Sequence, residues 1–583
     1  MTSSSQTEHR YKTRWTRGRG TNSFSLCSGV VTQNSSYAVH FCPRSAIRAV
    51  ELVNCVCNMG SLPKWEIGAY FVIWIGVSIY GILRVLITSL NVTQRVMDGL
   101  DLGTWPLGKY KDNGDTEWTL WIHIFGPQVL IGLIGHFVVT RICELPFLGL
   151  IQHRFYACAV YTAAFLYYVI GLQFVAVLLF HTVIMYVIAR SRVTWFCWLY
   201  GLMVFEGLTF EPFRTLQLGD HRNQPYYMPH VTSVTMVTTI MRLISLGLDL
   251  CDKEVDKQNE GERKKREKDG QREESSIFES LTYIFYLPTF FLGPLMTSED
   301  FKQQTRQNPR ACGVADLWGF LVSCARYACW GLLLEFIYHH FFIHMLQRTF
   351  FLFQSLDMWT LGAIGFLQCQ CFQLKYTVLY GVAGTFARAD GIVTPATPKV
   401  IAVIYAFGDM WKNFDKGLHK WMLRHVYIPL GGSQRGLPRQ VLSSFAPFLV
   451  LTVRGGGDLS IIVWAGANWI GVVLETLART AARTPYLQRL KTKYAPSDAS
   501  ERRLVALFHG CLLAPAFISM LVFLGGINVG RIYALKTYVI GFPLATLVTT
   551  FFMYCRVQGI MELEGWEKVD SEKNVEPKTR KKE

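Results

Sequence analysis

Long apolar stretches recur along almost the whole of this 583-residue chain. A bilayer core about 30 Å thick needs roughly 20 apolar residues for each helical crossing. Stretches of this kind lie at residues 67–90, 119–140, 156–170, 172–189, 194–210, 231–249, 277–294, 316–345, 359–385, 440–475, 503–525 and 535–556. Because lipid cannot hydrogen-bond to exposed backbone groups, the pattern predicts an all-α, polytopic transmembrane bundle of roughly 10 to 12 spanning or re-entrant helices.

Charge and cysteine usage exclude two other classes of partner. Lys and Arg exceed Asp and Glu by 58 to 42, a surplus that in a soluble chain would suggest nucleic acid. Between membrane spans, basic residues instead set orientation and attract anionic headgroups, so we expect membrane lipid and no nucleic acid as a partner. The 15 cysteines lack the paired C-x-x-C and His spacing of zinc sites, and we expect no metal site.

The polar segments divide the chain. Residues 1–58 are rich in Ser, Thr and Arg, lack the apolar core of a signal peptide, and are predicted to be a disordered extension. Residues 59–560 form the predicted membrane domain, interrupted by a charged loop at 251–276. Residues 561–583 are predicted to be a charged tail, which is disordered from Lys568 onward. The abundance of Lys and Arg places the loop and the tail on the cytosolic side.

One polar segment interrupts the apolar pattern of the second half. It reads FGDMWKNFDKGLHKWMLRHVYIPLGG over residues 407–432. Ionisable side chains at membrane depth usually face a cavity and mark a functional site. The alternative is an amphipathic helix at the membrane surface, with Trp411, Trp421 and Tyr427 as its aromatic belt. Asp415 and His419 are four residues apart, so on a helix they would share a face and could form an acid–base pair.

Several segments resemble the hedgehog acyltransferase branch of the membrane-bound O-acyltransferase family. The most characteristic is FDKGLHKWMLRHVYIPLGGSQRG, residues 414–436. Other matching segments are LPKWE at 62–66, YLPTFFLGP at 286–294, NWIGVVLE at 468–475 and VFLGG at 522–526. The segments follow the family's order, and the resemblance extends from about residue 59 to about residue 560.

This resemblance implies a bundle of helices around an acyl-CoA tunnel. It implies transfer of palmitate from palmitoyl-CoA to the N-terminal cysteine amine of a secreted, hedgehog-like signalling protein. Palmitoyl-CoA would be a co-substrate, and no tightly bound cofactor is expected. The resemblance further implies a multi-pass protein of the endoplasmic reticulum membrane, with the acyl donor arriving from the cytosol and the protein acceptor from the lumen.

The resemblance also assigns roles to individual residues, with one departure from the family pattern. Asp415 matches the family's catalytic Asp. The family's His follows some forty residues later in a Trp-His-Gly context, where this chain has Arg454 before three glycines. Arginine has five donors and no acceptor, so it cannot take up a proton. We predict Asp415, Arg454 and His419 as catalytic residues, and Trp411, Lys412 and His425 as substrate-binding residues.

Arg454 leaves three explanations open. The chain could be a catalytically impaired homologue that binds acyl-CoA or the signalling protein and regulates it. It could be an active enzyme in which His419 or His425 is the base and Arg454 binds coenzyme A phosphates or the oxyanion. The sequence around Arg454 could also be misassembled. A transporter is disfavoured, because residues 59–300 and 301–560 show no internal repeat.

Overall fold

The computed structural model describes residues 61–91, 100–104, 106–219, 225–256, 276–291, 293–307 and 314–575. The predicted extension 1–58 lies outside the described residues, as do residues 257–275 of the charged loop and 576–583 of the tail.

The described residues are helical apart from one small hairpin, in which β1 (Asp101–Leu102) pairs antiparallel with β2 (Tyr110–Lys111). The helices before the charged loop are α2 (Lys64–Leu90), α4 (Thr116–Trp118), η1 (Thr119–Ile124), α5 (Gly126–Cys143), η2 (Pro146–Leu148), η3 (Ile151–His153), α6 (Arg154–Val169), α7 (Leu172–Ala189), α8 (Thr194–Gly207), α9 (Glu211–Leu218) and α10 (Met228–Asp256). After the loop come α12 (Ile277–Ile284), η4 (Leu287–Thr289), α13 (Ser298–Gln307), α14 (Val314–His340), α15 (Ile343–Arg348), α16 (Phe350–Ser355), α17 (Met358–Ala389) and η5 (Ile401–Val403). The last third contains α18 (Phe407–Asn413), α19 (Lys416–Met422), η6 (Leu423–Tyr427), α20 (Leu437–Arg454), α21 (Leu459–Ala482), α22 (Pro485–Tyr494), α23 (Asp498–Gly525), α24 (Ile527–Ala534), η7 (Leu535–Ile540) and α25 (Leu544–Val575).

Eight helices in the described part of the chain are long and apolar enough to cross a membrane. They belong to α2, α5, α7, α10, α14, α21, α23 and α25. The helices α6, α8, α17 and α20 are shorter or more polar and lie over other predicted stretches. The prediction of an all-α, polytopic bundle is therefore confirmed.

The surface of α2 shows why such helices suit lipid. Val72 is 73% exposed and Ile79 is 53% exposed, while Gly81 and Val85 on the other side are buried. A soluble protein rarely leaves so long an apolar face in water. The exposed face of α2 is therefore a lipid-facing surface, and the buried face packs against α17 and α25.

Two predicted stretches differ from the helices observed. Residues 277–294 form the short helices α12 and η4, because Pro288 and the Gly293 turn prevent a continuous helix. Residues 440–475 are divided between α20 and α21 by Gly455–Gly457, where Gly456 and Gly457 have φ values of 70° and 72°. In addition, α25 continues to Val575, into the segment predicted as a tail.

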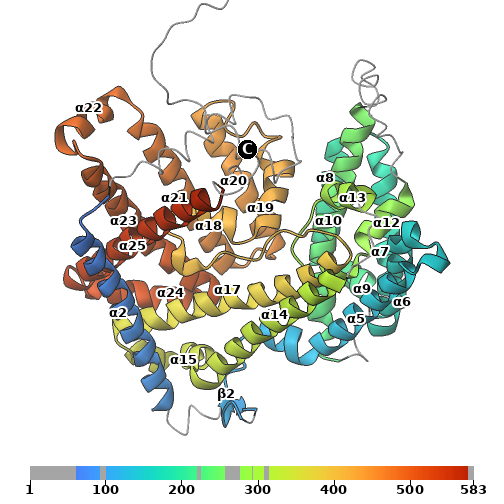
Figure 1. Cartoon of the computed structure of the whole chain (residues 1–583), viewed down its shortest axis with the longest axis horizontal. Helices are drawn as coiled ribbons and strands as arrows, with labels where there is room; N and C mark the ends of the chain where they lie inside the picture. The colour runs from blue at the N-terminus through green and yellow to red at the C-terminus, as the bar shows by residue number, and fades with distance from the viewer. Residues whose placement is uncertain are drawn as a thin grey trace, which may run out of the picture. The chain divides into compact units, whose positions relative to one another are not determined.

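The long helix α17 organises the second half of the domain. Figure 1 shows it running beside α14, and it also contacts α2, α23 and α24. Asp357 begins α17 by accepting hydrogen bonds from Trp359 N and Thr360 N, and it pairs with Arg84 of α2 at 2.6 Å. The helices α7, α8 and α10 form a separate packed group, and α20, α21, α23 and α25 pack in succession. The cavity described below lies where these groups approach α18 and α19.

Candidate functional site

A cavity of about 830 Å³ lies among the helices of the described structure. Its walls come from α4, α8, α10, α17 to α21, η6 and α23, so it is built by segments distant in the sequence. Most of the lining is apolar, with the aromatic side chains Phe205, Phe372, Trp411, Phe414, Phe448, Trp464 and Phe523. Its volume lies within the range of roughly 300–1,000 Å³ that is usual for ligand sites.

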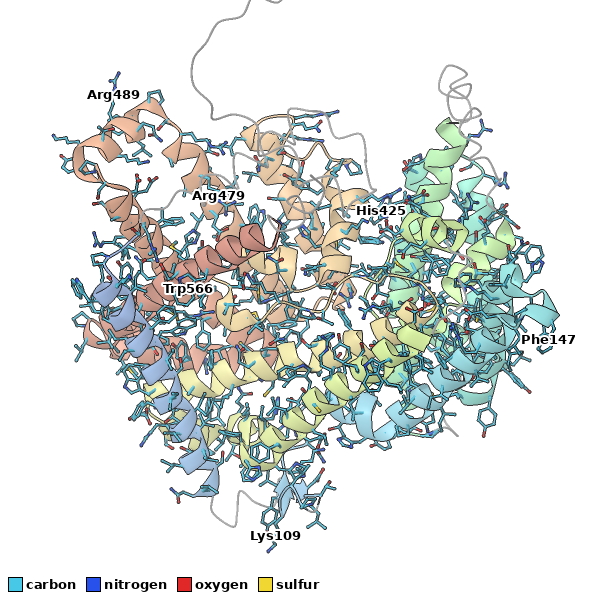
Figure 2. All side chains as sticks on the ribbon, viewed as in Figure 1. Lys109, Phe147, His425, Arg479, Arg489 and Trp566 are labelled. Atoms are coloured by element: carbon cyan, nitrogen blue, oxygen red, sulfur yellow. The ribbon has the colours of Figure 1, made fainter. Side chains whose placement is uncertain are left out.

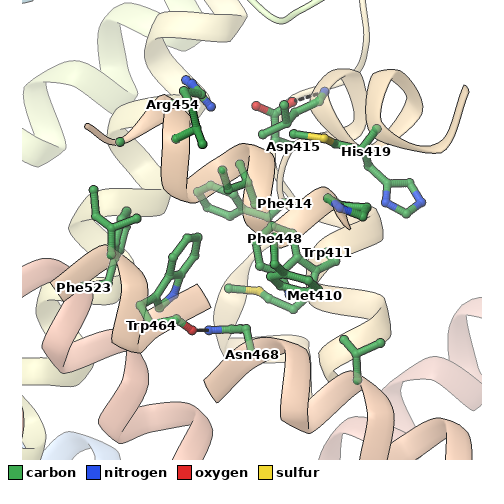
Figure 3. Close-up of a pocket in the computed structure, with 18 of the residues that line it drawn as sticks. Met410, Trp411, Phe414, Asp415, His419, Phe448, Arg454, Trp464, Asn468 and Phe523 are labelled. Atoms are coloured by element: carbon green, nitrogen blue, oxygen red, sulfur yellow. Dashed lines mark hydrogen bonds between the residues drawn. The ribbon is translucent and has the colours of Figure 1, made fainter. Parts of the chain in front are cut away.

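Asp415 lies in the wall of this cavity, at the junction between α18 and α19 (Figure 3). Its backbone is extended, and its carboxylate accepts a hydrogen bond from Leu418 N at 2.9 Å, which caps the start of α19. The second carboxylate oxygen accepts a hydrogen bond from the Tyr380 hydroxyl at 2.8 Å. The side chain is thus fixed in position and only partly buried.

Arg454 is the last residue of α20 and lines the same cavity. Figure 3 shows its guanidinium at the end of the cavity where Asp415 lies. Arg454 and Asp415 both act electrostatically on Tyr376 and Tyr380. The structure therefore brings together two residues that are separated by a helix and a glycine-containing turn. Arg454 is exposed, so its charge lies where the cavity reaches the surface of the protein.

His419 also lines the cavity, one turn after Asp415 on α19. Burial, reinforced by the positive charge of Lys412, lowers the pKa of His419 below its usual value. The imidazole is therefore neutral near pH 7 and can accept a proton.

The predicted binding residues separate into two groups. Trp411 lines the cavity, and its Nε1 and that of Trp464 are buried without a hydrogen-bond partner in the described structure. Lys412 is exposed and is not part of the lining. His425 lies outside the lining as well, between η6 and α10, where its Nε2 is 3.1 Å from Ser245 Oγ (Figure 2). Burial and the charge of Arg424 lower the pKa of His425 to about 3.

Several polar residues of the cavity were not predicted from the sequence. Glu117, Tyr376 and Tyr380 all line it, and the Tyr376 hydroxyl donates to Glu117 Oε1 at 2.9 Å. Lys375 Nζ lies 2.8 Å from Glu117 Oε2 and 2.9 Å from Asp115 Oδ1, so Glu117 is held by a buried cation. Glu117 could have been predicted from its position, because it is a carboxylate directly before the apolar stretch 119–140. The two tyrosines could not have been predicted, because aromatic residues at helical spacing also occur on lipid-facing surfaces.

A buried carboxylate outside the lining fixes the start of α18. Glu475 of α21 accepts hydrogen bonds from Phe407 N at 2.6 Å and from Gly408 N at 3.1 Å. These are backbone donors that a helix leaves unpaired at its first turn. Glu475 thereby sets the position of Trp411, which lies one turn further along α18.

The donor set does not favour a metal in this cavity. Among the residues with described placement, no three His, Cys, Asp or Glu side chains cluster closely enough to hold a metal ion. The lining instead includes carboxylates, phenols, imidazoles and a guanidinium, among them Glu117, Tyr380, Asp415, His419 and Arg454. Such a set can bind a cationic amine, transfer a proton and donate hydrogen bonds to an oxyanion.

Comparisons with known proteins agree with this architecture. The family model described as MBOAT, membrane-bound O-acyltransferase family, matches residues 157–517. The chain is 29% identical over 497 residues to protein-cysteine N-palmitoyltransferase HHAT of Mus musculus, covering 85% of this chain and 97% of that protein. It is 26% identical over 509 residues to the HHAT-like protein of Mus musculus, covering 86% of this chain and 96% of that protein. It is also 28% identical over 268 residues to protein-cysteine N-palmitoyltransferase Rasp of Drosophila melanogaster, covering 46% of this chain and 52% of Rasp. A match of this extent, on a multi-pass helical bundle, shows that the chain belongs to the membrane-bound O-acyltransferase family, in the HHAT branch.

Proposed function

We propose that this protein transfers palmitate from palmitoyl-CoA to the N-terminal cysteine amine of a secreted, hedgehog-like protein. The observation that carries the proposal is a mostly apolar cavity of about 830 Å³ with the Asp415 carboxylate in its wall. An acyl chain and a cationic amine have opposite requirements, and this cavity offers a surface for each. The names and extent of the HHAT and Rasp relatives support the same reaction.

The aromatic walls suit the acyl chain. Each buried CH₂ group contributes about 0.8 kcal/mol, so a palmitoyl chain could contribute on the order of 12 kcal/mol before ordering costs are subtracted. That free energy is enough to hold the donor while its thioester lies at the polar end. The indole N–H groups of Trp411 and Trp464, which lack protein partners, are available to hydrogen-bond a polar group of the donor.

The reaction forms an amide and releases coenzyme A. The amine nitrogen attacks the thioester carbonyl carbon, a C–N bond forms, the C–S bond breaks, and the nitrogen gives up one proton as the thiolate leaves. An α-amino group has a pKa near 8, so at neutral pH it arrives mostly as a cation and must lose a further proton before attack. The site therefore has to attract an ammonium group and then deprotonate it.

The cavity residues can divide these tasks. Asp415 and Glu117 attract the ammonium group, and Tyr380 holds the Asp415 carboxylate in place. His419, kept neutral by its lowered pKa, accepts the proton. Arg454 donates hydrogen bonds to the tetrahedral oxyanion or to the phosphates of coenzyme A. His425 is less suited to the role of base, because its Nε2 faces Ser245 outside the cavity lining.

We also propose the endoplasmic reticulum membrane as the site of action. Palmitoyl-CoA is cytosolic and a secreted acceptor is luminal, so the enzyme must meet one substrate from each side of a membrane. A cavity between membrane helices satisfies that requirement.

Arg454 favours a second candidate function, a catalytically impaired homologue that binds acyl-CoA or the signalling protein and regulates it. Arg454 lines the cavity where the resemblance places a histidine, and a guanidinium cannot act as a base. Loss of a general base typically lowers a rate by about 10² to 10⁴. The apolar cavity would remain able to bind an acyl chain in such a homologue.

One experiment separates the two functions. The purified full-length protein and an Arg454→His variant are incubated with labelled palmitoyl-CoA and a peptide that begins with cysteine. Amide formation by both proteins supports an active enzyme, whereas amide formation only by the variant supports the impaired homologue. Failure of both proteins to bind palmitoyl-CoA, measured by retention of the label, would remove both proposals. A peptide with an acetylated N-terminus is the matched control, because it has no amine to accept the acyl group.

A further inference from the structure

A short basic helix connects two membrane-spanning helices without packing into the bundle. It is α22, which lies between α21 and α23, and the connecting segments on its two sides are only 483–484 and 495–497. None of its ten residues is buried. Figure 1 shows it at the outer ends of α21 and α23. Because both neighbours cross the membrane, a helix tethered so closely to their ends lies near the membrane surface.

One face of α22 is apolar. Tyr486, Leu490 and Tyr494 follow one another at intervals of four residues, and Leu487 lies beside them, so all four share one side of the helix. Tyr486 and Tyr494 are each 70% exposed, and Leu487 is 37% exposed. Tyrosine combines an apolar ring with a polar hydroxyl and concentrates where membrane meets water. This apolar stripe therefore suits the headgroup region of a bilayer.

The remaining surface around α22 is basic. Residues 476–497 contain no Asp or Glu and five basic residues, Arg479, Arg483, Arg489, Lys491 and Lys493. In the part of the chain that the structure describes, Arg483, Arg489 and Lys493 have no acidic partner within ion-pair distance. Figure 2 shows the Arg489 side chain pointing away from the bundle. Three cations are thus available to an anionic partner outside the protein.

The helix is held in place between its neighbours. Thr484 caps its start, and Gln488 Nε2 donates a hydrogen bond to the Ala482 carbonyl at 2.6 Å. At the other end, Lys491 Nζ lies 2.7 Å from Glu501 Oε2 of α23. The available cations therefore belong to a folded helix that is tied to both membrane spans.

We propose that α22 docks on the membrane surface and binds anionic phospholipid headgroups. The apolar stripe enters the headgroup region, and Arg489 and Lys493, which directly precede Leu490 and Tyr494, reach the charged groups of the lipid. Basic residues next to membrane spans stay on the cytosolic side, and the cytosolic leaflet carries the anionic lipid. A soluble acidic protein would have to displace the membrane from this face, because the short connections hold α22 at the lipid surface.

Hydrogen–deuterium exchange in lipid nanodiscs tests the proposal. The full-length protein is reconstituted in discs of phosphatidylcholine alone and in discs that also contain phosphatidylserine, and amide exchange of residues 485–494 is compared. One cation near an anionic surface strengthens binding roughly fivefold, so exchange in the phosphatidylserine discs should be slower by roughly that factor or more. The difference should shrink at about 1 M salt, because exposed charges are then screened.

Two charge variants distinguish this helix from other basic surfaces of the protein. Arg489→Gln/Lys493→Gln should lose most of the difference between the two kinds of disc. Lys109→Gln/Arg531→Gln is the matched control, because it removes the same residue types from the β1–β2 hairpin and from α24. This control should keep the full difference. All four side chains are exposed, so both variants should keep the wild-type thermal midpoint in detergent.

A third variant tests the apolar stripe. Tyr486→Ser/Tyr494→Ser keeps every cation and removes two aromatic rings. Exchange of residues 485–494 should then be faster than in the wild-type protein in both kinds of disc, since the helix has less apolar surface to insert.

Two further measurements identify the bound group. Inorganic phosphate added to the phosphatidylcholine discs should leave exchange unchanged, because it offers nothing to the apolar stripe. Retention of labelled palmitoyl-CoA should be the same in Arg489→Gln/Lys493→Gln as in the wild-type protein. Slower exchange with phosphate alone would assign the cations to a free anion, and loss of palmitoyl-CoA would assign them to coenzyme A; either result would overturn the lipid proposal.

Two results of the nanodisc comparison would also overturn it. One is equal exchange of residues 485–494 in both kinds of disc for the wild-type protein. The other is the full difference in Arg489→Gln/Lys493→Gln, which would place the contact with anionic lipid elsewhere.

Discussion

Two aspartates of this protein each accept a hydrogen bond from a tyrosine, but their surroundings differ. Asp390 accepts a hydrogen bond from the Tyr286 hydroxyl at 2.8 Å, and Asp415 accepts one from the Tyr380 hydroxyl, also at 2.8 Å. Asp390 is 2% exposed and lies among charged partners: His136 Nε2 is 2.9 Å away and Arg141 NH2 is 3.9 Å away. Its charge is compensated inside the protein.

Asp415 has no charged group within ion-pair distance among the residues that the structure describes, although Arg454 lines the same cavity. In the part of the chain that the structure describes, its carboxylate meets the Tyr380 hydroxyl and Leu418 N–H and forms no ion pair. It also lines the cavity of about 830 Å³, and Asp390 is not part of that lining. The comparison shows that a tyrosine–aspartate hydrogen bond can stabilise a packed core at one place and orient a carboxylate toward a ligand at another. The cationic partner missing at Asp415 is what an incoming ammonium group would supply.

The largest effect is expected from Asp415→Asn. The amide keeps the shape and can still cap α19, but it loses the charge that attracts the ammonium group. We expect acyl transfer to the cysteine peptide to fall by about 10² to 10⁴. The free energy of unfolding should change by no more than about 1 kcal/mol, since asparagine is also a good helix cap. If this variant transferred acyl groups at the wild-type rate, the Asp415 carboxylate would have no chemical role.

The next largest effect is expected at Asp390, the aspartate that is paired with Tyr286 in the core. Asp390→Asn removes the charge that compensates His136 and Arg141, and breaking a buried ion pair costs about 3–5 kcal/mol. We expect a clearly lower thermal midpoint in detergent and poor recovery of the protein. The fraction that folds should transfer acyl groups at the wild-type rate. An unchanged midpoint would contradict the distinction between the two aspartates.

The sequence was sufficient to predict the bundle because apolar length is a local property. The same reasoning failed to divide 277–294 and 440–475, where Pro288 and the glycines at 455–457 end helices inside apolar sequence. Hydropathy averaged over about 20 residues does not reveal a single proline or a short run of glycines that ends a helix.

The site was only partly predictable, for a different reason. Asp415 and His419 belong to one short segment whose polar residues stand out against apolar neighbours. Glu117 and Tyr380 reach the same cavity from other helices, and nothing local links them to Asp415. The sequence also did not show which side chains of the polar segment point into the cavity: Lys412 and His425 belong to the same segment as Asp415, yet neither lines the cavity. The packing of helices that are distant in the sequence determines which side chains line the cavity.

Removing the tyrosines should sharpen the comparison with a smaller effect. Hydrogen bonds to charged groups contribute about 1.5–3 kcal/mol, and Tyr286 is fully buried. Tyr286→Phe should therefore lower the free energy of unfolding by that amount and leave transfer unchanged in the folded fraction. Tyr380→Phe should lower kcat/KM about tenfold, which corresponds to about 1.4 kcal/mol, with a smaller change in stability. Equal stability losses in both variants would mean that Tyr380 has only a packing role.

The smallest effect separates the two histidines that accompany these aspartates. His136 is bonded to Asp390, whereas His419 faces the cavity with its pKa lowered by burial and by Lys412. Above its lowered pKa, His419 is neutral and can accept a proton; below it, this ability is lost. The acceptor binds as an ammonium group and gives its proton to His419, so log kcat/KM should change little with pH between the lowered pKa of His419 and about pH 8, where the free amine titrates. At lower pH, once His419 is protonated, log kcat/KM should fall with a slope of about 1. In His419→Gln the amine has to lose its proton before it binds, so log kcat/KM should rise with a slope of about 1 up to about pH 8. A flat profile below pH 8 in His419→Gln would assign the proton to another residue of the cavity.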